Sequence, residues 1–442
     1  MIQGGRVPFA SGIMSMVAAI AAIASLVALL LFRNNDWGYG LLTMAIGSVG
    51  LAISARKYTS ISRAVAWAFI IRLAICVIYS ILGDGDADNY GVNAVYYASL
   101  PIEEIFFNIP TGAYFYSWII SFFFRIFGEY YMPIRVMNAT LSVYCVLIFS
   151  NIISHIYKNR NAVIKAAWVI ALFPNLIRFS SYFANREVVL LLFMLLYIKH
   201  AYLYYNNGRT KHLILSVIAL VPAMILHTSM IAMIMLTILI ILSRKNNSQN
   251  RGASLIWKGF LVSITIVAFV YMLSSGIGME KFSIGGGVDL DVESISNIGE
   301  MSAAGRAAYL SGVSFSNPIL TLLFLPIRML YFLYTPFLWM ISSVIDIVGL
   351  FDAILYIWVS IPLWKQIKEI RRKRNNKTSD DRFIFLLFIT LIVIVAMFAA
   401  VTSNYGTAIR HRCKLFPIFL LIALPCLNIP FIKIKRSKYI VK

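Results

Sequence analysis

Five carboxylates lie close together early in the chain, in a sequence otherwise poor in acidic residues. Asp84, Asp86 and Asp88 fall within five positions, and Glu103 and Glu104 follow. The whole chain has 18 acidic residues against 39 basic ones. Carboxylates near one another repel and are costly to desolvate, so such a cluster is typical of a site for a cation, a transferred proton or basic partners. The alternative is a solvated loop, because glycine and aspartate both favour turns.

Two arginines and several polar side chains follow the Phe173-Pro174 pair. Arg178 and Arg186 are eight residues apart, with hydroxyls and an amide between them. Guanidinium groups bind phosphate bidentately and stay charged at any working pH. These arginines are therefore candidates for contact with a phosphate or a sugar. The alternative is that Arg186 and Glu187 form a local ion pair at a helix start, where glutamate suits the helix dipole.

Further cationic or titratable side chains lie in the C-terminal half. His227 separates two short apolar segments, where a histidine is more often structural than catalytic. Arg328 lies inside an apolar run that contains prolines, and Arg306 ends a glycine-rich and acidic segment. The glycines at 285–287 lack the strand-to-helix context of a phosphate loop. We interpret the segment 274–317 as a flexible lid or an acceptor-binding loop, and a disordered connection is the alternative.

The composition places these side chains in a membrane protein. Sixty per cent of the 442 residues are hydrophobic and the mean hydropathy is +0.81, whereas soluble domains are about 45–50 % apolar. Continuous apolar runs of about 17–25 residues match helices that cross the bilayer core. We interpret the net charge of +21 first as loop charge facing the cytoplasm and anionic lipids, and second as affinity for anionic substrates. We expect no nucleic-acid partner.

We therefore predict an all-α fold, a polytopic transmembrane helical bundle of about 12–14 helices that forms a single integral membrane domain over residues 1–442. Two longer loops, near 83–112 and 274–317, are expected on the outer face, and a basic loop near 365–382 on the cytoplasmic face. Prolines and Arg328 in the segment 318–339 favour a broken or lateral helix that lines a cavity. The expected helices cover residues 9–32, 37–54, 64–82, 111–127, 133–157, 162–183, 188–205, 212–226, 229–242, 255–273, 318–339, 344–364, 383–401 and 415–432, with a short amphipathic helix at 90–100.

Arg410, His411 and Arg412 lie together in the junction between the last two expected spans. By alternation from the basic loop 365–382, this junction faces outward, against the trend that places cations inside. That deviation favours binding of an anion such as a lipid diphosphate, and anchoring to lipid headgroups is the alternative. Residues two apart on a helix do not share a face. We therefore expect Arg410 to contact the substrate more closely than Arg412 does.

The order of several short motifs resembles that of known membrane enzymes. The motifs are Pro110-Thr-Gly-Ala-Tyr114, Arg125-Ile-Phe-Gly128, Arg135-Val-Met-Asn138, Phe173-Pro174, Ser180-Ser181 and Asn185-Arg186-Glu187. This order resembles integral-membrane glycosyltransferases of the GT-C type, including protein-mannosyltransferase-like members. It also resembles the Wzy- and EpsG-like polysaccharide polymerases, in which a Pro…Ser-Ser…Arg-Glu stretch and a late Gly-Thr…Arg-His-Arg junction are features. The resemblance covers roughly residues 62–230 and 400–417, and the sequence Asp-Ala-Asp-Asn-Tyr at 86–90 departs from the Asp-Glu pair of the mannosyltransferases.

The resemblance implies a polyprenyl-linked donor whose anion lies at the outer interface. Asp84, Asp86 and Asp88 are the catalytic candidates, since a carboxylate there could take the proton of the acceptor hydroxyl as general base. Alternatively, the acidic loop holds a divalent cation that neutralises the leaving group; no cofactor is certain and no metal ligand is assigned. The substrate-binding candidates, whose cations would neutralise the leaving phosphate, are Tyr90, Arg178, Arg186, Glu187, His227, Arg306, Arg328, Arg410, His411 and Arg412.

Three functions are compatible with these patterns. The leading hypothesis is polymerisation of polyprenyl-diphosphate-linked oligosaccharide repeat units into surface polysaccharide, on the outer face of a bacterial inner membrane. The alternative is a GT-C glycosyltransferase that uses a polyprenyl-phosphate sugar donor. A glycolipid transporter is the third, although such proteins show internal repeats and the sequence has no clear one. The expected partners are polyprenyl-linked glycans and membrane lipids and, for a polymerase, a chain-length regulator and a flippase.

Overall fold

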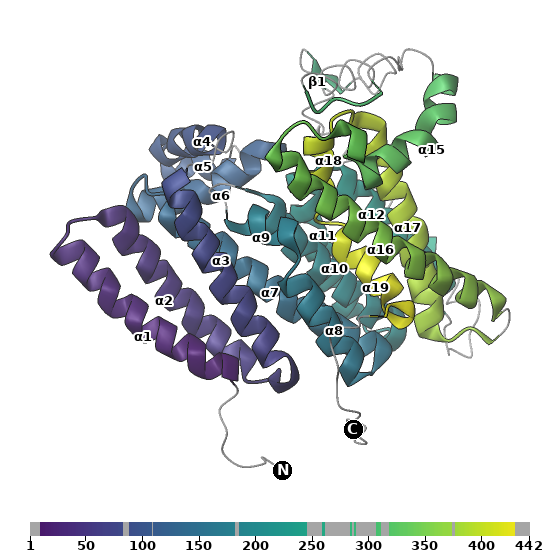
Figure 1. The fold of residues 1–442 in the computed structure, drawn as a ribbon, viewed down its shortest axis with the longest axis horizontal. Helices are drawn as coiled ribbons and strands as arrows, with labels where there is room; N and C mark the ends of the chain where they lie inside the picture. Colours follow the sequence, from purple (N-terminus) through teal and green to yellow (C-terminus); the bar gives the residue numbers. More distant parts are fainter. Residues whose placement is uncertain are drawn as a thin grey trace, which may run out of the picture. The chain divides into compact units, whose positions relative to one another are not determined.

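In the computed structural model, the described residues form mainly helices (Figure 1). The chain falls into two compact units, the first formed by Met1–Leu195 with Asn428–Lys442 and the second by Leu196–Leu427. The residues that the structure describes are 9–82, 88–107, 109–181, 185–244, 259–260, 283–284, 287–288, 306–310, 318–373 and 376–428.

The first unit follows the expected order of apolar helices. Most bounds agree with the predicted ones to within two or three residues, because each apolar run is flanked by polar residues that end it. The short amphipathic helix predicted at 90–100 is confirmed as α4. The elements are α1 (Phe9–Leu30), α2 (Asn35–Ala55), η1 (Thr59–Ile61), α3 (Ser62–Leu82), α4 (Asp88–Ser99), α5 (Ile102–Phe107), α6 (Gly112–Phe127), α7 (Met132–Tyr157), α8 (Arg160–Ala171), α9 (Pro174–Ser181) and the start of α10 (Glu187–Asn207).

Glycines of α2 allow this helix to lie directly on α7. A Cβ atom at Gly40 would overlap with the side chain of Met132, and one at Gly47 would overlap with Thr140. Small residues let helix backbones approach closely where lipid provides no hydrophobic drive for association. The packing of α2 and α3 on α7 therefore gives the first unit a core that surrounds α7. In the most apolar 18-residue stretch of α7, 72 % of the residues are buried.

The single helix predicted at 162–183 is wrong, since the chain forms two helices there. α8 and α9 meet at an angle of 52°. Pro174 cannot donate a backbone hydrogen bond and clashes with a preceding helical turn. The buried guanidinium of Arg72, on α3, donates from Nη1 to the carbonyl of Ala171 at 2.9 Å and from Nε to Ser142 at 2.8 Å. Arg72 thus satisfies a carbonyl at the end of α8 and stabilises the break.

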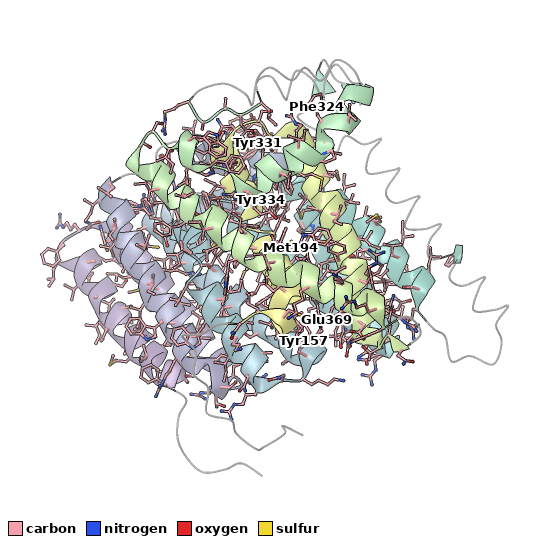
Figure 2. The ribbon with its side chains drawn as sticks, turned by 45° about the vertical axis from the view of Figure 1, so that its right-hand side comes forward. Tyr157, Met194, Phe324, Tyr331, Tyr334 and Glu369 are labelled. Carbon is pink, nitrogen blue, oxygen red and sulfur yellow. The ribbon has the colours of Figure 1, made fainter. Side chains whose placement is uncertain are left out.

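The described residues of the second unit are also mainly helical, and they include a short antiparallel strand pair in which Ser283 faces Val288 and Ile284 faces Gly287. In the last turn of α15, the hydroxyl of Tyr334 donates to Ser360 of α16 at 3.0 Å; Figure 2 labels Tyr334 and its neighbour Tyr331. The elements are the rest of α10, α11 (Thr210–Leu226), η3 (Thr228–Ile231), α12 (Ala232–Ser243), β1 (Ser283–Ile284), β2 (Gly287–Val288), α15 (Pro318–Tyr334), η5 (Leu338–Met340), α16 (Val344–Arg372), α17 (Ser379–Val401), α18 (Tyr405–Arg412), α19 (Phe416–Ala423) and η7 (Leu424–Cys426).

Three predicted connections are partly helical. The segment 83–112 contains α4 and α5, and the segment 365–377, expected as a basic loop, continues α16 to Arg372. Its lysine, glutamate and arginine residues are good helix formers, and its apolar side chains Ile367 and Ile370 share one buried face. The junction before the last span forms α18, which is capped by the side chain of Asn404 through the backbone N–H of Gly406 at 2.8 Å.

The all-α membrane fold is confirmed. Among the described helices, seven are long and apolar enough to cross a membrane, or eight if α8 and α9 together make one bent span. The shorter apolar helices α6, α11, α12, α15 and α19 account for much of the difference from the predicted 12–14. The helix expected at 255–273 lies outside the described residues except for 259–260, and the loop 274–317 is described only at 283–284, 287–288 and 306–310.

Candidate functional site

The candidate residues are divided between the two units. Asp88, Tyr90, Arg178, Arg186 and Glu187 belong to the first unit. The remaining six belong to the second, and they are His227, Arg306, Arg328, Arg410, His411 and Arg412. Asp84 and Asp86 lie outside the described residues. Within the described part of the chain, no three histidine, cysteine or acidic side chains are grouped so that they could hold a metal ion.

In the first unit, α4 anchors the end of the acidic stretch, which is our name for residues 84–88. Asp88 is the first residue of this helix, and the Tyr90 ring meets the Tyr116 ring of α6 edge-on, with centroids 5.9 Å apart. The buried Tyr116 hydroxyl donates to Asn138 of α7 at 2.9 Å. Arg125, in the last turn of α6, donates to the carbonyl of Leu100, just beyond the end of α4. These contacts fix the position at which the chain leaves the acidic stretch.

The second polar group of the first unit lies around the start of α10. Arg186 and Glu187 are 8 % and 1 % exposed, and the side-chain oxygen of Asn185 accepts the Glu187 backbone N–H at 3.2 Å. Arg178 lies in the last turn of α9, with its guanidinium 5.5 Å from the Phe179 ring. Burial of a guanidinium or of a carboxylate is costly unless its polar atoms are satisfied. This pair is therefore built into the unit and is not a solvated surface feature.

Asn175 of α9 is a polar residue that the sequence did not single out. Its side chain is fully buried, and among the described residues neither atom of its amide has a hydrogen-bond partner. Buried amides are normally satisfied, so this one calls for an explanation. Since an amide can both donate to and accept from a hydroxyl, Asn175 is a further candidate for contact with a sugar.

In the second unit, Arg306 is held by a carboxylate at the start of α16. Asp346 accepts from Arg306 Nη1 at 2.5 Å and from the backbone N–H groups of Ser342 and Ser343 at 3.0 and 2.9 Å. Its other oxygen accepts from the Tyr405 hydroxyl at 3.0 Å. We call Arg306, Ser342, Asp346 and Tyr405 the Asp346 cluster. Because both of its oxygens are occupied, Asp346 holds Arg306 in place and is poorly suited to accept a substrate proton.

Backbone pairing brings Arg306 to this cluster. Residue 308 forms an antiparallel bridge with Asn404, flanked by hydrogen bonds from the Tyr309 N–H to Ser403 and from the Tyr405 N–H to Ala307. The hydrogen bond to Asp346 raises the pKa of Arg306, while burial and the same carboxylate raise the pKa of Tyr405. The Arg306 side chain is 53 % exposed. A permanent cation is thus held at a surface where an anion can reach it.

Arg328 and Arg412 are fully buried and have structural partners. Arg328 donates to the Ala399 carbonyl at 3.2 Å and to Ser403, at the end of α17. Arg412 forms an ion pair with Asp352 and donates to the carbonyls of Phe332 and Leu333 at 3.1 and 2.9 Å. Cations suit the C-terminal ends of helices. A phosphate could reach either arginine only after these contacts opened, so their role in binding substrate stays a prediction.

Two histidines and a lysine meet beside Phe398 of α17. The His227 and His411 rings are 4.8 Å apart and nearly perpendicular, and each lies 4.9 Å from the Phe398 ring. Lys414, which is fully buried, has its Nζ 3.4 Å from His411 Nδ1. The structure thus brings together two predicted residues from distant segments, and it adds Lys414.

Arg410 and Arg412 lie on different faces of α18, as their spacing predicts. Arg412 faces the interior and is fully buried, whereas Arg410 is half-buried. Asp346 and Asp352, the partners of Arg306 and Arg412, are not among the residues predicted from the sequence. A signal was available, because acidic residues inside an apolar run are costly unless they are paired.

Comparison with known proteins supports one of the two resemblances more than the other. Residues 111–273 match the family model described as dolichyl-phosphate-mannose-protein mannosyltransferase. The match begins at α6, runs beyond α12 and includes Arg178, Arg186, Glu187 and His227. No curated protein and no solved structure matches the chain. The chain is thus similar to GT-C-type integral-membrane glycosyltransferases of the mannosyltransferase-like kind, and the match does not single out the polysaccharide polymerases.

Proposed function

We propose that the protein transfers a sugar from a polyprenyl-phosphate donor to an acceptor hydroxyl at the outer face of a bacterial inner membrane. The observation that carries this proposal is the family match over residues 111–273, which contains the buried Arg186-Glu187 pair. In this reaction the bond between the sugar and the phosphate oxygen breaks, and the acceptor oxygen forms the new glycosidic bond. The acceptor proton goes to a base, and polyprenyl phosphate leaves.

The acidic stretch is our proposed source of the base. Asp88 begins α4, and the Tyr90–Tyr116–Asn138 contacts fix this end of the stretch within the first unit. A carboxylate of this stretch would accept the proton of the acceptor hydroxyl as general base. Alternatively, the same carboxylates would bind a divalent cation that neutralises the leaving phosphate. We keep this second role as part of the proposal.

Arginines supply the charge that the leaving phosphate requires. Arg186, which belongs to the same unit as the acidic stretch and lies within the family match, is one candidate. Arg306, in the second unit, is a separate candidate, since Asp346 holds it while its side chain stays half-exposed. Donors that are fixed before the reaction stabilise developing charge without reorganisation. Arg410, half-buried on α18, is a third candidate.

A polymerase that acts on polyprenyl-diphosphate-linked repeat units is the second candidate. The observation that favours it is the motif Gly406-Thr407…Arg410-His411-Arg412, which resembles that of the polymerases and forms α18 next to the Asp346 cluster. The bond changes are the same, but the leaving group is a diphosphate and the acceptor is another lipid-linked oligosaccharide.

Deletion of the gene, followed by gel analysis of surface glycan and mass analysis of lipid-linked intermediates, tests both candidates. A glycan or glycoprotein that lacks one sugar supports the transferase. A single repeat unit left on its lipid carrier supports the polymerase instead. Unchanged glycans, together with no transfer by the purified protein from a polyprenyl-phosphate sugar in nanodiscs, would contradict both.

A further inference from the structure

A cavity of about 450 Å³ lies at one end of the second unit, away from the residues discussed so far. It is formed where α10 and α12 end and α17 begins. Its volume falls in the range of about 300–1,000 Å³ that is usual for small-ligand sites. Six of its lining residues are polar or charged, and they are Asn206, Asn207, Arg244, Lys377, Ser379 and Arg382.

Three of these residues are cations, and none of the described residues that line the cavity is acidic. The two nearest carboxylates in sequence have other partners. Asp380 accepts from the Tyr202 hydroxyl at 2.7 Å, and Asp381 binds Lys373 Nζ at 2.9 and 3.0 Å. Basic side chains that line one cavity attract anions through their combined charge.

The cations are held in place by the surrounding fold. The Arg244 guanidinium lies 5.3 Å from the centre of the Tyr204 ring, and Lys377 Nζ lies 5.5 Å from that of Phe385. At Gly208, whose φ is +71°, a Cβ atom would overlap with the Arg244 guanidinium. The glycine thus both allows the turn after α10 and leaves room for the arginine.

Ser379, the first residue of α17, also lines the cavity, and its hydroxyl can donate to a phosphate oxygen. The first turn of α17 itself carries Asp380 and Asp381, and the Thr378 side chain accepts the Asp381 backbone N–H at 3.0 Å. The attraction for an anion therefore comes from the three basic side chains and not from the helix end.

We propose that this cavity, the α17 pocket, binds a phosphate group, either as the headgroup of an anionic lipid or as a soluble phosphate. By the charge of the segment 365–382, this end of the unit is the one predicted to face the cytoplasm. The pocket is therefore a second anion site, and it takes no part in the sugar transfer proposed above. It would hold the protein to anionic lipid or sense a cytoplasmic phosphate compound.

Two binding measurements on the purified full-length protein distinguish the sources. Native mass spectrometry with added phosphatidylglycerol counts retained lipid, and thermal denaturation in phosphatidylcholine nanodiscs with added inorganic pyrophosphate reports a soluble ligand. The test variant carries Arg244→Gln, Lys377→Gln and Arg382→Gln. Hydrogen bonds to charged groups contribute about 1.5–3 kcal/mol each, so we expect at least about a tenfold loss of affinity in whichever measurement shows binding.

The matched control neutralises three exposed cations of the same basic segment that do not line the pocket, by Lys368→Gln, Arg371→Gln and Arg372→Gln. This control should bind like the wild type. The single variant Arg382→Gln serves if the triple variant does not fold. Absence of binding by the wild-type protein in both measurements, or equal losses in the test and control variants, would overturn the proposal whatever the outcome of the glycan experiment.

Discussion

The buried ion pair between Arg412 and Asp352 provides the sharpest prediction. The two side chains are 0 % and 1 % exposed, and Arg412 also donates to two carbonyls at the end of α15. Asp352→Asn keeps the shape of the side chain but leaves the guanidinium charge buried without its counter-charge. Loss of one partner of a buried pair costs about 3–5 kcal/mol. At roughly 2–4 °C per kcal/mol, the melting temperature should fall by about 6–20 °C.

Arg412→Lys should be nearly as severe. Lysine keeps the charge, but it lacks the planar fork that reaches Asp352 and the carbonyls of Phe332 and Leu333 together. The double variant Asp352→Leu with Arg412→Met removes both charges and should recover much of the loss, because apolar replacements of buried pairs are often tolerated. The single variants Asp352→Leu and Arg412→Met, together with this double variant and the wild type, form a double-mutant cycle whose coupling energy isolates the pair.

The assay is thermal denaturation of the detergent-purified protein, followed by size-exclusion chromatography of what remains soluble. Arg410→Lys is the matched control, because Arg410 lies on the same helix but is only half-buried. A melting temperature of Asp352→Asn within about 2 °C of the wild type, less than 1 kcal/mol on the same scale, would refute the reasoning. It would mean that the burial of Arg412 does not depend on Asp352.

Three further predictions concern activity and topology. Asp86→Asn combined with Asp88→Asn should lower sugar transfer by about 10²–10⁴-fold at normal protein abundance; transfer at the wild-type level would make the acidic stretch a solvated turn. Arg410→Lys should lower transfer by about tenfold or more without changing the melting temperature, since lysine cannot grip a phosphate bidentately; full activity would remove Arg410 from the site. A reporter that is active only outside the cytoplasmic membrane should be silent when fused within Lys365–Lys377, and activity there would invert the topology.

Much of the helical framework follows from the sequence alone. Apolar runs about as long as the bilayer core is thick must be helical, because hydrocarbon offers no partner to an unsatisfied backbone group. That rule predicts α1, α2, α3, α7, α10 and α17 with nearly correct bounds. The sequence also predicts the short helix α4, because the spacing of apolar residues in an amphipathic helix is a local property. The type and number of candidate arginines were equally visible in the sequence.

Only the tertiary structure decided which of those arginines are committed to the fold. Arg306, Arg328 and Arg412 look alike in sequence, yet Arg328 and Arg412 are fully buried, whereas the side chain of Arg306 is half-exposed. Their partners lie far along the chain, as with Arg306 and Asp346, which are 40 residues apart, and Arg412 and Asp352, which are 60 apart. The bend at Pro174 likewise depends on Arg72, which is 99 residues from the carbonyl that it satisfies. The local sequence pattern determines where helices form, because helical hydrogen bonds join residues only four positions apart. The burial and pairing of a charge depend instead on which distant elements pack around it.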